Sequence, residues 1–295
     1  MAANLHHDVF DMATLPTTVK PVPARKARVR ALVIPREHGA WGLLLIPLIT
    51  GACAGLAVER NWLSLALFTV AALALFWIRT PVESALGASP MRAQSVAETN
   101  GLLLAIAVLG STAMACTTLL LLQGDARLLV LGAAAALAFI AQAVVKKLGR
   151  GARMASHLIG SIGLTVTAPA AWYVVTQRLD ATALGLWLLN WIFAGNQIHF
   201  VQLRIHAARA ATRQEKVRRG RGFLIGQFAM IAALLAAWRL HLVPGLALLA
   251  FIPLLVRGLL WFKAGARPLV VKRLGWSELA HGVSFGLLLV AAYLL

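Results

Sequence analysis

Charged side chains are scarce in this sequence. They make up 13% of the 295 residues, while hydrophobic residues make up 60% and the mean hydropathy is +0.79. Soluble domains carry about 25% charged residues, so this composition argues against an ordinary soluble protein. It indicates an all-α, polytopic membrane protein, a helical bundle with most of the chain in one membrane domain.

Cysteine and acidic residues are also few. The two cysteines, Cys53 and Cys116, lie inside apolar runs without zinc-type spacing, so we interpret them as small buried hydrophobes. Ten acidic residues against 28 basic ones give a net charge of +18. In a soluble protein this charge would suggest nucleic-acid binding. Here the distribution of the charge explains it, and we expect no nucleic-acid partner.

Long apolar runs cover most of the chain. A bilayer core about 30 Å thick needs about 20 apolar residues in helical form. The sequence predicts nine such helices, at 39–58, 62–79, 99–122, 127–146, 156–176, 181–203, 223–239, 242–261 and 276–295. The seventh and eighth runs are short and are separated only by Arg239-Leu240-His241, so the loop charges must decide whether they form one helix or two.

Basic residues alternate between the predicted loops. Of the 28 Lys and Arg residues, 24 lie before the first helix or in and beside the second, fourth, sixth and eighth loops. Cytoplasmic loops carry the excess of Lys and Arg, and loops six and eight are both basic, so two helices must separate them. We therefore expect a cytoplasmic N-terminus and a periplasmic or extracellular C-terminus in the bacterial inner membrane. Arg257, one turn inside the membrane, is expected to snorkel.

The first 33 residues differ from the rest. They have no apolar periodicity, contain Pro16, Pro21 and Pro23, and become basic from Lys20 onward. We interpret 1–33 as a disordered basic cytoplasmic tail and 34–295 as the nine-helix membrane domain. Contact of the basic segments with anionic membrane lipids is expected.

Polar residues within the helices gather toward the predicted cytoplasmic ends. An unsatisfied polar group in hydrocarbon costs several kcal/mol, so polar residues at one depth in many helices suggest a shared cavity open to the cytoplasm. Each residue also has a structural interpretation, as an interfacial or helix-locking group. The residues that we expect to bind a ligand are Arg36, Glu37, His38, Trp41, Asn196, Gln197, His199, Gln202, Glu278 and His281.

The spacing of these residues gives little support for a metal site. Glu278-x-x-His281 matches the two-ligand pattern of metal sites in helical bundles, but the sequence holds one copy of it. We expect no metal and no cofactor, and no catalytic residue is identified.

Two glycine pairs predict where helices approach closely. Gly51 with Gly55, and Gly282 with Gly286, have the small-xxx-small spacing of tightly packed membrane helices. The first and last helices are therefore candidates for close packing against neighbours.

Two motifs resemble those of a known family. Pro35-Arg36-Glu37-His38-Gly39-Ala40-Trp41-Gly42, with Pro47 and Gly51 after it, is similar to the signature of the YwiC-like family of bacterial membrane proteins. The segment Lys272-Arg273-Leu274-Gly275-Trp276-Ser277-Glu278-Leu279 resembles that family's entry into its last helix. The resemblance covers about 34–295 and implies no established activity.

A broader resemblance is to the UbiA-type intramembrane prenyltransferases. It implies nine helices, an internal N-terminus and a cavity facing the cytoplasm. Those enzymes hold magnesium and an isoprenyl diphosphate with two Asp-rich motifs, near the ends of helices two and six. This sequence has Arg79-Thr80-Pro81-Val82-Glu83 and Asn196-Gln197-Ile198-His199 there, without Asp. The architecture can be shared while that reaction is absent or altered.

Several functions are compatible with these observations. We favour a cytoplasm-facing cavity that binds a lipid, quinone or isoprenoid-type ligand. The alternatives are a small-solute transporter, with Pro47, Pro169 and Pro253 breaking helices, a UbiA-like transferase with altered motifs, and an accessory subunit whose basic loops bind a partner. Neither the ligand nor the oligomeric state follows from the sequence.

Overall fold

The computed structural model describes residues 28, 30, 32–34, 38–87, 92–124, 126–208, 210, 212–265 and 269–295, with His38 and Arg150 described by backbone alone. The described residues hold helices and loops and contain no strand. The helices are α2 (His38–Val58), α3 (Trp62–Ala85), α4 (Val96–Gln123), α5 (Arg127–Lys147), η1 (Arg150–Ala152), α6 (Arg153–Thr165), α7 (Thr167–Thr176), α8 (Ala181–His206), α9 (Arg213–Arg239), η2 (Gly245–Phe251), α10 (Ile252–Lys263) and α11 (Val271–Leu294).

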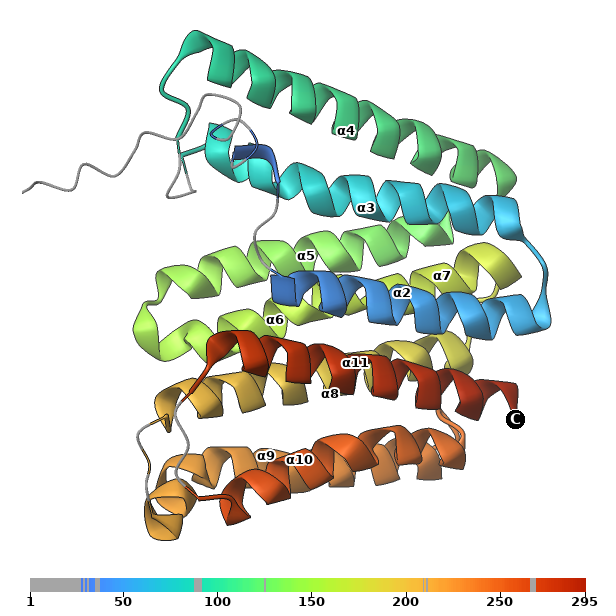
Figure 1. Ribbon diagram of the computed structural model, residues 1–295. Helices are drawn as coiled ribbons and strands as arrows, with labels where there is room; N and C mark the ends of the chain where they lie inside the picture. The colour runs from blue at the N-terminus through green and yellow to red at the C-terminus, as the bar shows by residue number, and fades with distance from the viewer. Residues whose placement is uncertain are drawn as a thin grey trace, which may run out of the picture.

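These elements form a bundle of helices that run up and down (Figure 1). Within the described ranges there are nine long segments, when α6 is counted with α7 and η2 with α10. The all-α membrane bundle expected from the sequence is therefore confirmed, with a helical segment at each of the nine predicted positions. Residues 1–27 lie outside the described part, so the disorder of the tail stays a prediction.

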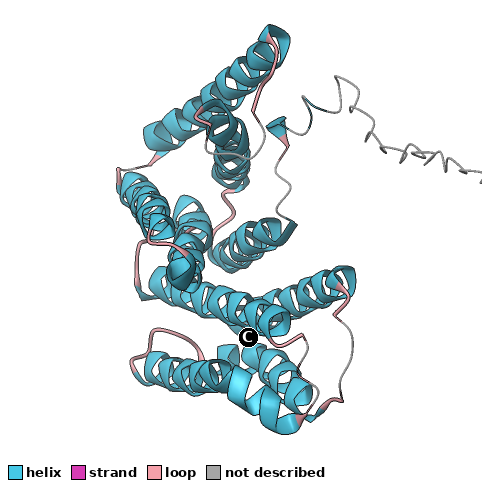
Figure 2. Cartoon of the chain, turned by 90° about the vertical axis from the view of Figure 1, so that its left-hand side faces the viewer, coloured by secondary structure: helices cyan, strands magenta, loops and turns pink. Residues whose placement is uncertain are grey.

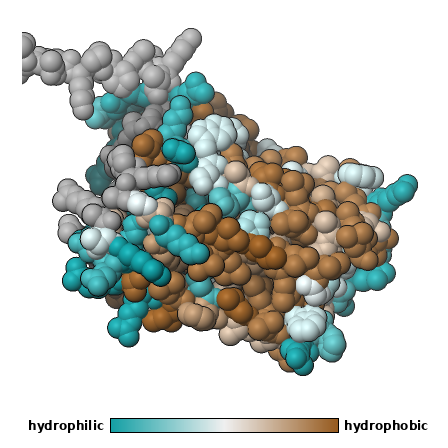
Figure 3. Space-filling view, turned by 60° about the horizontal axis from the view of Figure 1, so that its bottom comes forward, coloured by the Kyte–Doolittle hydropathy of each residue, from teal (hydrophilic) through white to brown (hydrophobic). Residues whose placement is uncertain are grey.

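The helices alternate in direction, so their connections fall at two opposite ends of the bundle. The loops that follow α3, α5, α8 and α10 lie at the left in Figure 1, and Figure 2 views the molecule from that end. These are the loops in which the sequence concentrates Lys and Arg. We call this the basic end and the opposite one the far end. In Figure 3, a broad apolar surface lies between more hydrophilic ends.

Helix α8 differs from the other long segments in polarity. In the described part of the chain, eight helical segments have the length and hydropathy to cross a membrane, and α8 is not among them. Its inner residues include Asn190 and Asn196, both buried, which lower the hydropathy. The helix packs against α2, α6, α7, α9 and α11. Its polar side chains therefore face protein, which explains how a less apolar helix occupies the middle of the bundle.

Close packing of α2 follows the glycine pairs. A Cβ atom at Gly51 would lie 2.1 Å from the Ala168 carbonyl oxygen of α7, and one at Gly55 would lie 3.1 Å from Val175. On the other side, a Cβ atom at Gly282 of α11 would lie 2.5 Å from Ile46. The prediction that these glycines mark close helix approaches is confirmed, and α2 is clamped between α7 and α11.

Prolines divide two of the nine segments. Pro169 follows the junction of α6 and α7 at Val166, and Pro253 stands at the junction of η2 and α10. A proline lacks an N–H group, and its ring clashes with the carbonyl group four residues earlier. Pro47 lies inside α2 without dividing it. At the first junction, the Thr167 hydroxyl donates hydrogen bonds to the carbonyl oxygens of Leu164 and Leu44, at 2.9 and 3.1 Å, which tie the break to α2.

Lys216 has a structural role in the basic sixth loop region. It lies in the first turn of α9 and is buried. Its ammonium group donates to the carbonyl oxygens of Trp261, Ala264 and Gly265 at the end of α10. It therefore satisfies carbonyl groups that the helix leaves open.

The contact of α2 with α7 predicts contrasting effects for two glycines of the same helix. Gly51→Ala forces a methyl group against the Ala168 backbone. It should lower the free energy of unfolding by about 1–3 kcal/mol or more. Gly42→Ala has nothing within 4 Å of the added atom and should be neutral or raise stability by up to about 1 kcal/mol. Thermal unfolding in detergent measures both, and equal melting temperatures for the two variants would contradict the packing.

Candidate functional site

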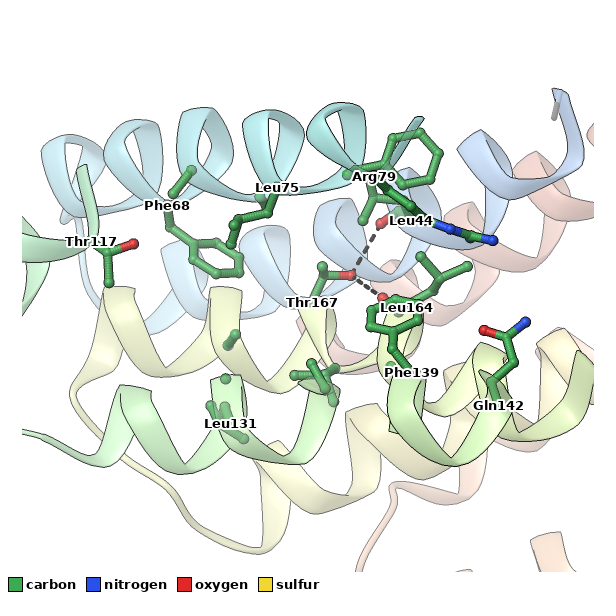
Figure 4. Close-up of a pocket in the computed structure, with 18 of the residues that line it drawn as sticks. Leu44, Phe68, Leu75, Arg79, Thr117, Leu131, Phe139, Gln142, Leu164 and Thr167 are labelled. Atoms are coloured by element: carbon green, nitrogen blue, oxygen red, sulfur yellow. Dashed lines mark hydrogen bonds between the residues drawn. The ribbon is translucent and has the colours of Figure 1, made fainter. Parts of the chain in front are cut away.

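A large cavity lies between α3 and α5. Its volume is about 820 Å³, within the range of about 300–1,000 Å³ that is common for ligand pockets. Residues of α2, α6 and α7 complete its walls, and α4 contributes Thr117 and Leu120. We call this cavity the α3–α5 pocket; Figure 4 shows it.

The pocket forms because neighbouring helices pair in separate hairpins. Helix α3 packs mainly on α4, and α5 packs mainly on α6. Small residues on the facing surfaces hollow out the space between the hairpins, among them Ala71, Ala72, Gly132, Ala135 and Ala170. The pocket also opens sideways, because the lining residues Leu75 and Leu129 are 57% and 51% exposed. The opening therefore lies beside exposed leucine side chains on the outer surface of the bundle.

Polar lining residues are concentrated at one end of the pocket. Arg79, Glu83, Gln142, Lys146 and Lys147 line it where α3 and α5 reach the basic end. Toward the far end the lining is apolar except for threonine, as the positions of Phe68, Leu131 and Thr117 opposite Arg79 and Gln142 in Figure 4 show. The pocket therefore has a polar mouth and an apolar body.

The polar mouth carries an excess of positive charge. Arg79 Nε donates to Glu83 Oε1 at 2.7 Å, so this acid balances one of the three basic groups. Lys146 and Lys147 end α5 and are exposed. The mouth thus presents a field that attracts an anion.

Helix α6 fixes the position of Gln142 in the mouth. Ser156 Oγ donates to the Gln142 carbonyl oxygen at 3.3 Å. Gly160 leaves room for the Gln142 side chain, since a Cβ atom at Gly160 would lie 2.4 Å from Gln142 Oε1. The amide is thus held over α6 and provides a hydrogen-bonding group between the charges and the apolar body.

A second polar group of residues is packed inside the other half of the bundle. Arg257 donates to Glu278 Oε2 and, through Nη2, to Asn196 Oδ1 at 2.8 Å, and its guanidinium lies 4.1 Å from the Phe200 ring centre. Asn196 Nδ2 donates to Gln227 Oε1 at 3.1 Å. We call Asn196, Gln227, Arg257 and Glu278 the buried polar cluster. It links α8, α9, α10 and α11.

The buried polar cluster is incompletely hydrogen-bonded. Arg257 Nε and Glu278 Oε1 are buried and have no hydrogen-bond partner among the described residues. The expected snorkelling of Arg257 is wrong, because the residue is 8% exposed and its charge is directed at Glu278. An intramembrane arginine with an acid on another helix was the sequence signal for this pair.

The ten residues expected to bind a ligand fall into several places. Arg36 and Glu37 lie outside the described residues, as does the His38 side chain. Trp41 packs edge-on against Phe76, a lining residue of the α3–α5 pocket, with ring centres 4.8 Å apart. The positions of these residues do not test a binding role, which stays a prediction for all ten.

The remaining candidates lie around α8 and α11. Asn196 and His199 border a smaller cavity of about 240 Å³. Gln197 Nε2 donates to the Glu278 carbonyl oxygen at 2.7 Å. The Gln202 carbonyl oxygen lies 2.8 Å from His206 Nδ1, and His281 Nδ1 lies 2.6 Å from the Ser277 carbonyl oxygen of its own helix. In the described part of the chain, no group of three or more His, Cys, Asp or Glu residues is arranged to hold a metal ion.

Sequence reasoning underrated the residues of the pocket mouth. In the sequence, Arg79, Lys146 and Lys147 belong to the loop charges that indicate topology, and Gln142 is not among the residues expected to bind a ligand. The sequence did show that they share the basic end, but the separation of α3 from α5 depends on packing between distant segments.

The buried Arg257–Glu278 ion pair predicts that the loss of stability on removing one charge depends on whether the other charge is still present. Arg257→Met leaves the Glu278 carboxylate buried without its partner and should lower the free energy of unfolding by about 3–5 kcal/mol. Arg257→Met with Glu278→Leu removes both charges and should recover most of the loss. As a control, Arg178→Met breaks the exposed Arg178–Glu59 pair (3.3 Å) and should cost less than about 1 kcal/mol. Melting temperatures in detergent measure each variant. A double variant as unstable as Arg257→Met would contradict the predicted dependence between the two charges.

Comparison with known proteins gives one family match. Residues 34–172 match the family model described as YwiC-like protein. This range holds α2 to α7 and therefore most of the α3–α5 pocket. No curated protein and no solved structure matches the chain. Over residues 34–172, the chain is therefore similar to the YwiC-like protein family.

Proposed function

We propose that this membrane protein binds an anionic amphiphile in the α3–α5 pocket, with a phosphate-type head at the polar mouth and an apolar tail in the body. The observation that carries the proposal is the one-sided distribution of polar groups along one continuous cavity. It supports a ligand of the lipid or isoprenoid class, the class that the sequence favoured, but bound at this pocket.

Charge complementarity supports an anionic head. Among the described lining residues, Arg79, Lys146 and Lys147 stand at the mouth with one acid, Glu83. Basic residues near a membrane surface attract anionic headgroups by about 1 kcal/mol each. Gln142 adds a hydrogen-bonding group beside them. A neutral polar head would gain the amide contact without the charge attraction.

The apolar body supports a tail that enters from the membrane. The walls are built from Leu, Phe, Ala and Gly side chains, and the opening between α3 and α5 lies on the apolar outer surface. A tail that moves sideways from the bilayer into the pocket passes from one apolar environment to another. It is therefore not exposed to water on the way.

The orientation of the mouth is part of the proposal. The basic end holds most Lys and Arg residues, and cytoplasmic loops carry this excess. The mouth would then face the cytoplasm, with the N-terminus on the same side and the C-terminus across the bacterial inner membrane.

Cysteine labelling in intact cells tests the orientation. In a chain with Cys53 and Cys116 replaced by alanine, Leu240→Cys at the far end should react with a membrane-impermeant maleimide from outside. Leu148→Cys at the basic end should react only after the membrane is opened. Both positions are exposed, at 68% and 73%, so access is matched. The reverse pattern overturns the orientation and leaves the pocket unaffected.

Head recognition is tested by the two exposed lysines of the mouth. Lys146→Gln with Lys147→Gln should weaken binding of hexadecyl phosphate about tenfold or more and leave binding of hexadecanol nearly unchanged. The control is Lys272→Gln with Arg273→Gln, an adjacent exposed basic pair at the same end in α11 that does not line the pocket. Native mass spectrometry or a detergent binding assay gives the readout. If both double variants lose the same binding affinity for hexadecyl phosphate, the probe is attracted only by the overall positive charge of the basic end and not by the pocket mouth.

Tail binding is tested inside the body of the pocket. Ala135→Trp places a large side chain among the lining residues, whereas Ala136→Trp places it at the next, exposed position of α5, outside the lining. We expect the first variant to reduce hexadecyl phosphate binding strongly and the second to bind like the parent protein. Equal binding by the two tryptophan variants would show that the tail lies elsewhere.

A further inference from the structure

We infer that the α3–α5 pocket selects an amphiphile with a single polar head and a chain longer than one membrane leaflet. This inference rests on the proposed function and narrows its ligand. Its basis is the length of the cavity, the continuity of its lining and the absence of charge among the described lining residues at its far end.

The pocket extends over most of the hydrocarbon core. Below the polar mouth, the lining of α3 runs from Arg79 to Phe68, which corresponds to about 16 Å at 1.5 Å per residue. On α5 it runs from Gln142 to Leu128, which corresponds to about 21 Å. The acyl chains of one leaflet reach about 15 Å, half of the core. An ordinary phospholipid with its head at the mouth would therefore leave the far part of the pocket unfilled.

The lining forms one continuous stripe on each helix. On α5 the lining residues recur every three or four positions, which places them on one face. They are Leu128, Leu129, Leu131, Gly132, Ala135, Phe139, Gln142, Ala143, Lys146 and Lys147. No described lining residue between Leu128 and Phe139 is polar on this helix. A single extended chain can follow the stripe from the mouth to the far end.

The far end offers little to a second head. Its described polar lining is the hydroxyl group of Thr117, and the charged lining residues are all at the mouth. Two amphiphiles entering from opposite leaflets would require a second charged or amide-bearing end. The asymmetry therefore favours one long molecule over two short ones.

Gly132 provides a way to shorten the pocket. It lines the cavity near the far end, and a Cβ atom built there meets nothing within 4 Å. From Gln142, where the polar mouth ends, to Gly132 the distance along α5 is about 15 Å, against about 21 Å to Leu128. Gly132→Phe should therefore close the far part without disturbing the mouth. Ala133→Phe is the matched control, because Ala133 is the next residue, is exposed and does not line the pocket.

The test measures binding of decyl, hexadecyl and tetracosyl phosphate to the full chain in detergent, corrected for the partition of each probe into micelles. The parent protein and Ala133→Phe should prefer tetracosyl over decyl phosphate by about tenfold or more. In Gly132→Phe, tetracosyl phosphate should lose its advantage over hexadecyl phosphate, while decyl phosphate binds as before.

The outcomes separate this inference from the proposed function. If decyl, hexadecyl and tetracosyl phosphate bind equally and binding still depends on Lys146 and Lys147, the length selection is wrong and the proposed function stands. If two hexadecyl phosphate molecules bind to each protein molecule with equal affinity, the proposal of a single ligand in an asymmetric pocket is wrong. If no phosphate ester binds above the level of the corresponding alcohol, the proposed function itself fails.

Discussion

Helix α2 lies so close to α7 that Gly51 has no room for a side chain against the Ala168 carbonyl group. Apolar side chains gain nothing by leaving lipid for protein, so close backbone packing holds membrane helices together. The clamp of α2 between α7 and α11 fixes the floor of the α3–α5 pocket, and the hydroxyl group of Thr167 ties the α6–α7 junction to the same helix. Helices α3 and α5 both pack against α7, and the pocket lies between them.

Polar residues have different surroundings in the two halves of the bundle, one around α8 and the other around α3 and α5. Around α8, polar and charged side chains pair with each other, as Arg257 does with Glu278, and link four helices. Around α3 and α5, the polar residues line an open mouth. A polar group in a membrane must be satisfied by protein, by water or by a ligand. The first half pairs most of its polar atoms within the protein, although Arg257 Nε and Glu278 Oε1 have no partner among the described residues. The second half has the larger cavity, so it is the better candidate for ligand recognition.

Much of the architecture could be predicted from the sequence, because helix length, loop charge and glycine spacing are local patterns. The basic loops correctly separated 223–239 from 242–261 although only Leu240 and His241 lie between these ranges. Gly51 and Gly282 correctly marked close contacts. The pocket could not be predicted in this way. Its existence depends on how far the α3–α4 and α5–α6 hairpins diverge, which reflects packing among segments distant in the chain. Arg257 was misread for the same reason, since its partner is 21 residues away on another helix.

The character of the pocket determines which of its features can give specificity. Lipid tails are as apolar as leucine, so the apolar walls alone give no preference for a ligand over the bilayer lipids that surround the protein. Preference must arise where the cavity differs from bulk lipid, at the charged mouth and in the length of an unbranched path that exceeds one leaflet. Removing charge at the mouth should therefore change which heads bind, and shortening the body should change which chains bind. These two properties can vary independently because they lie at opposite ends of α5.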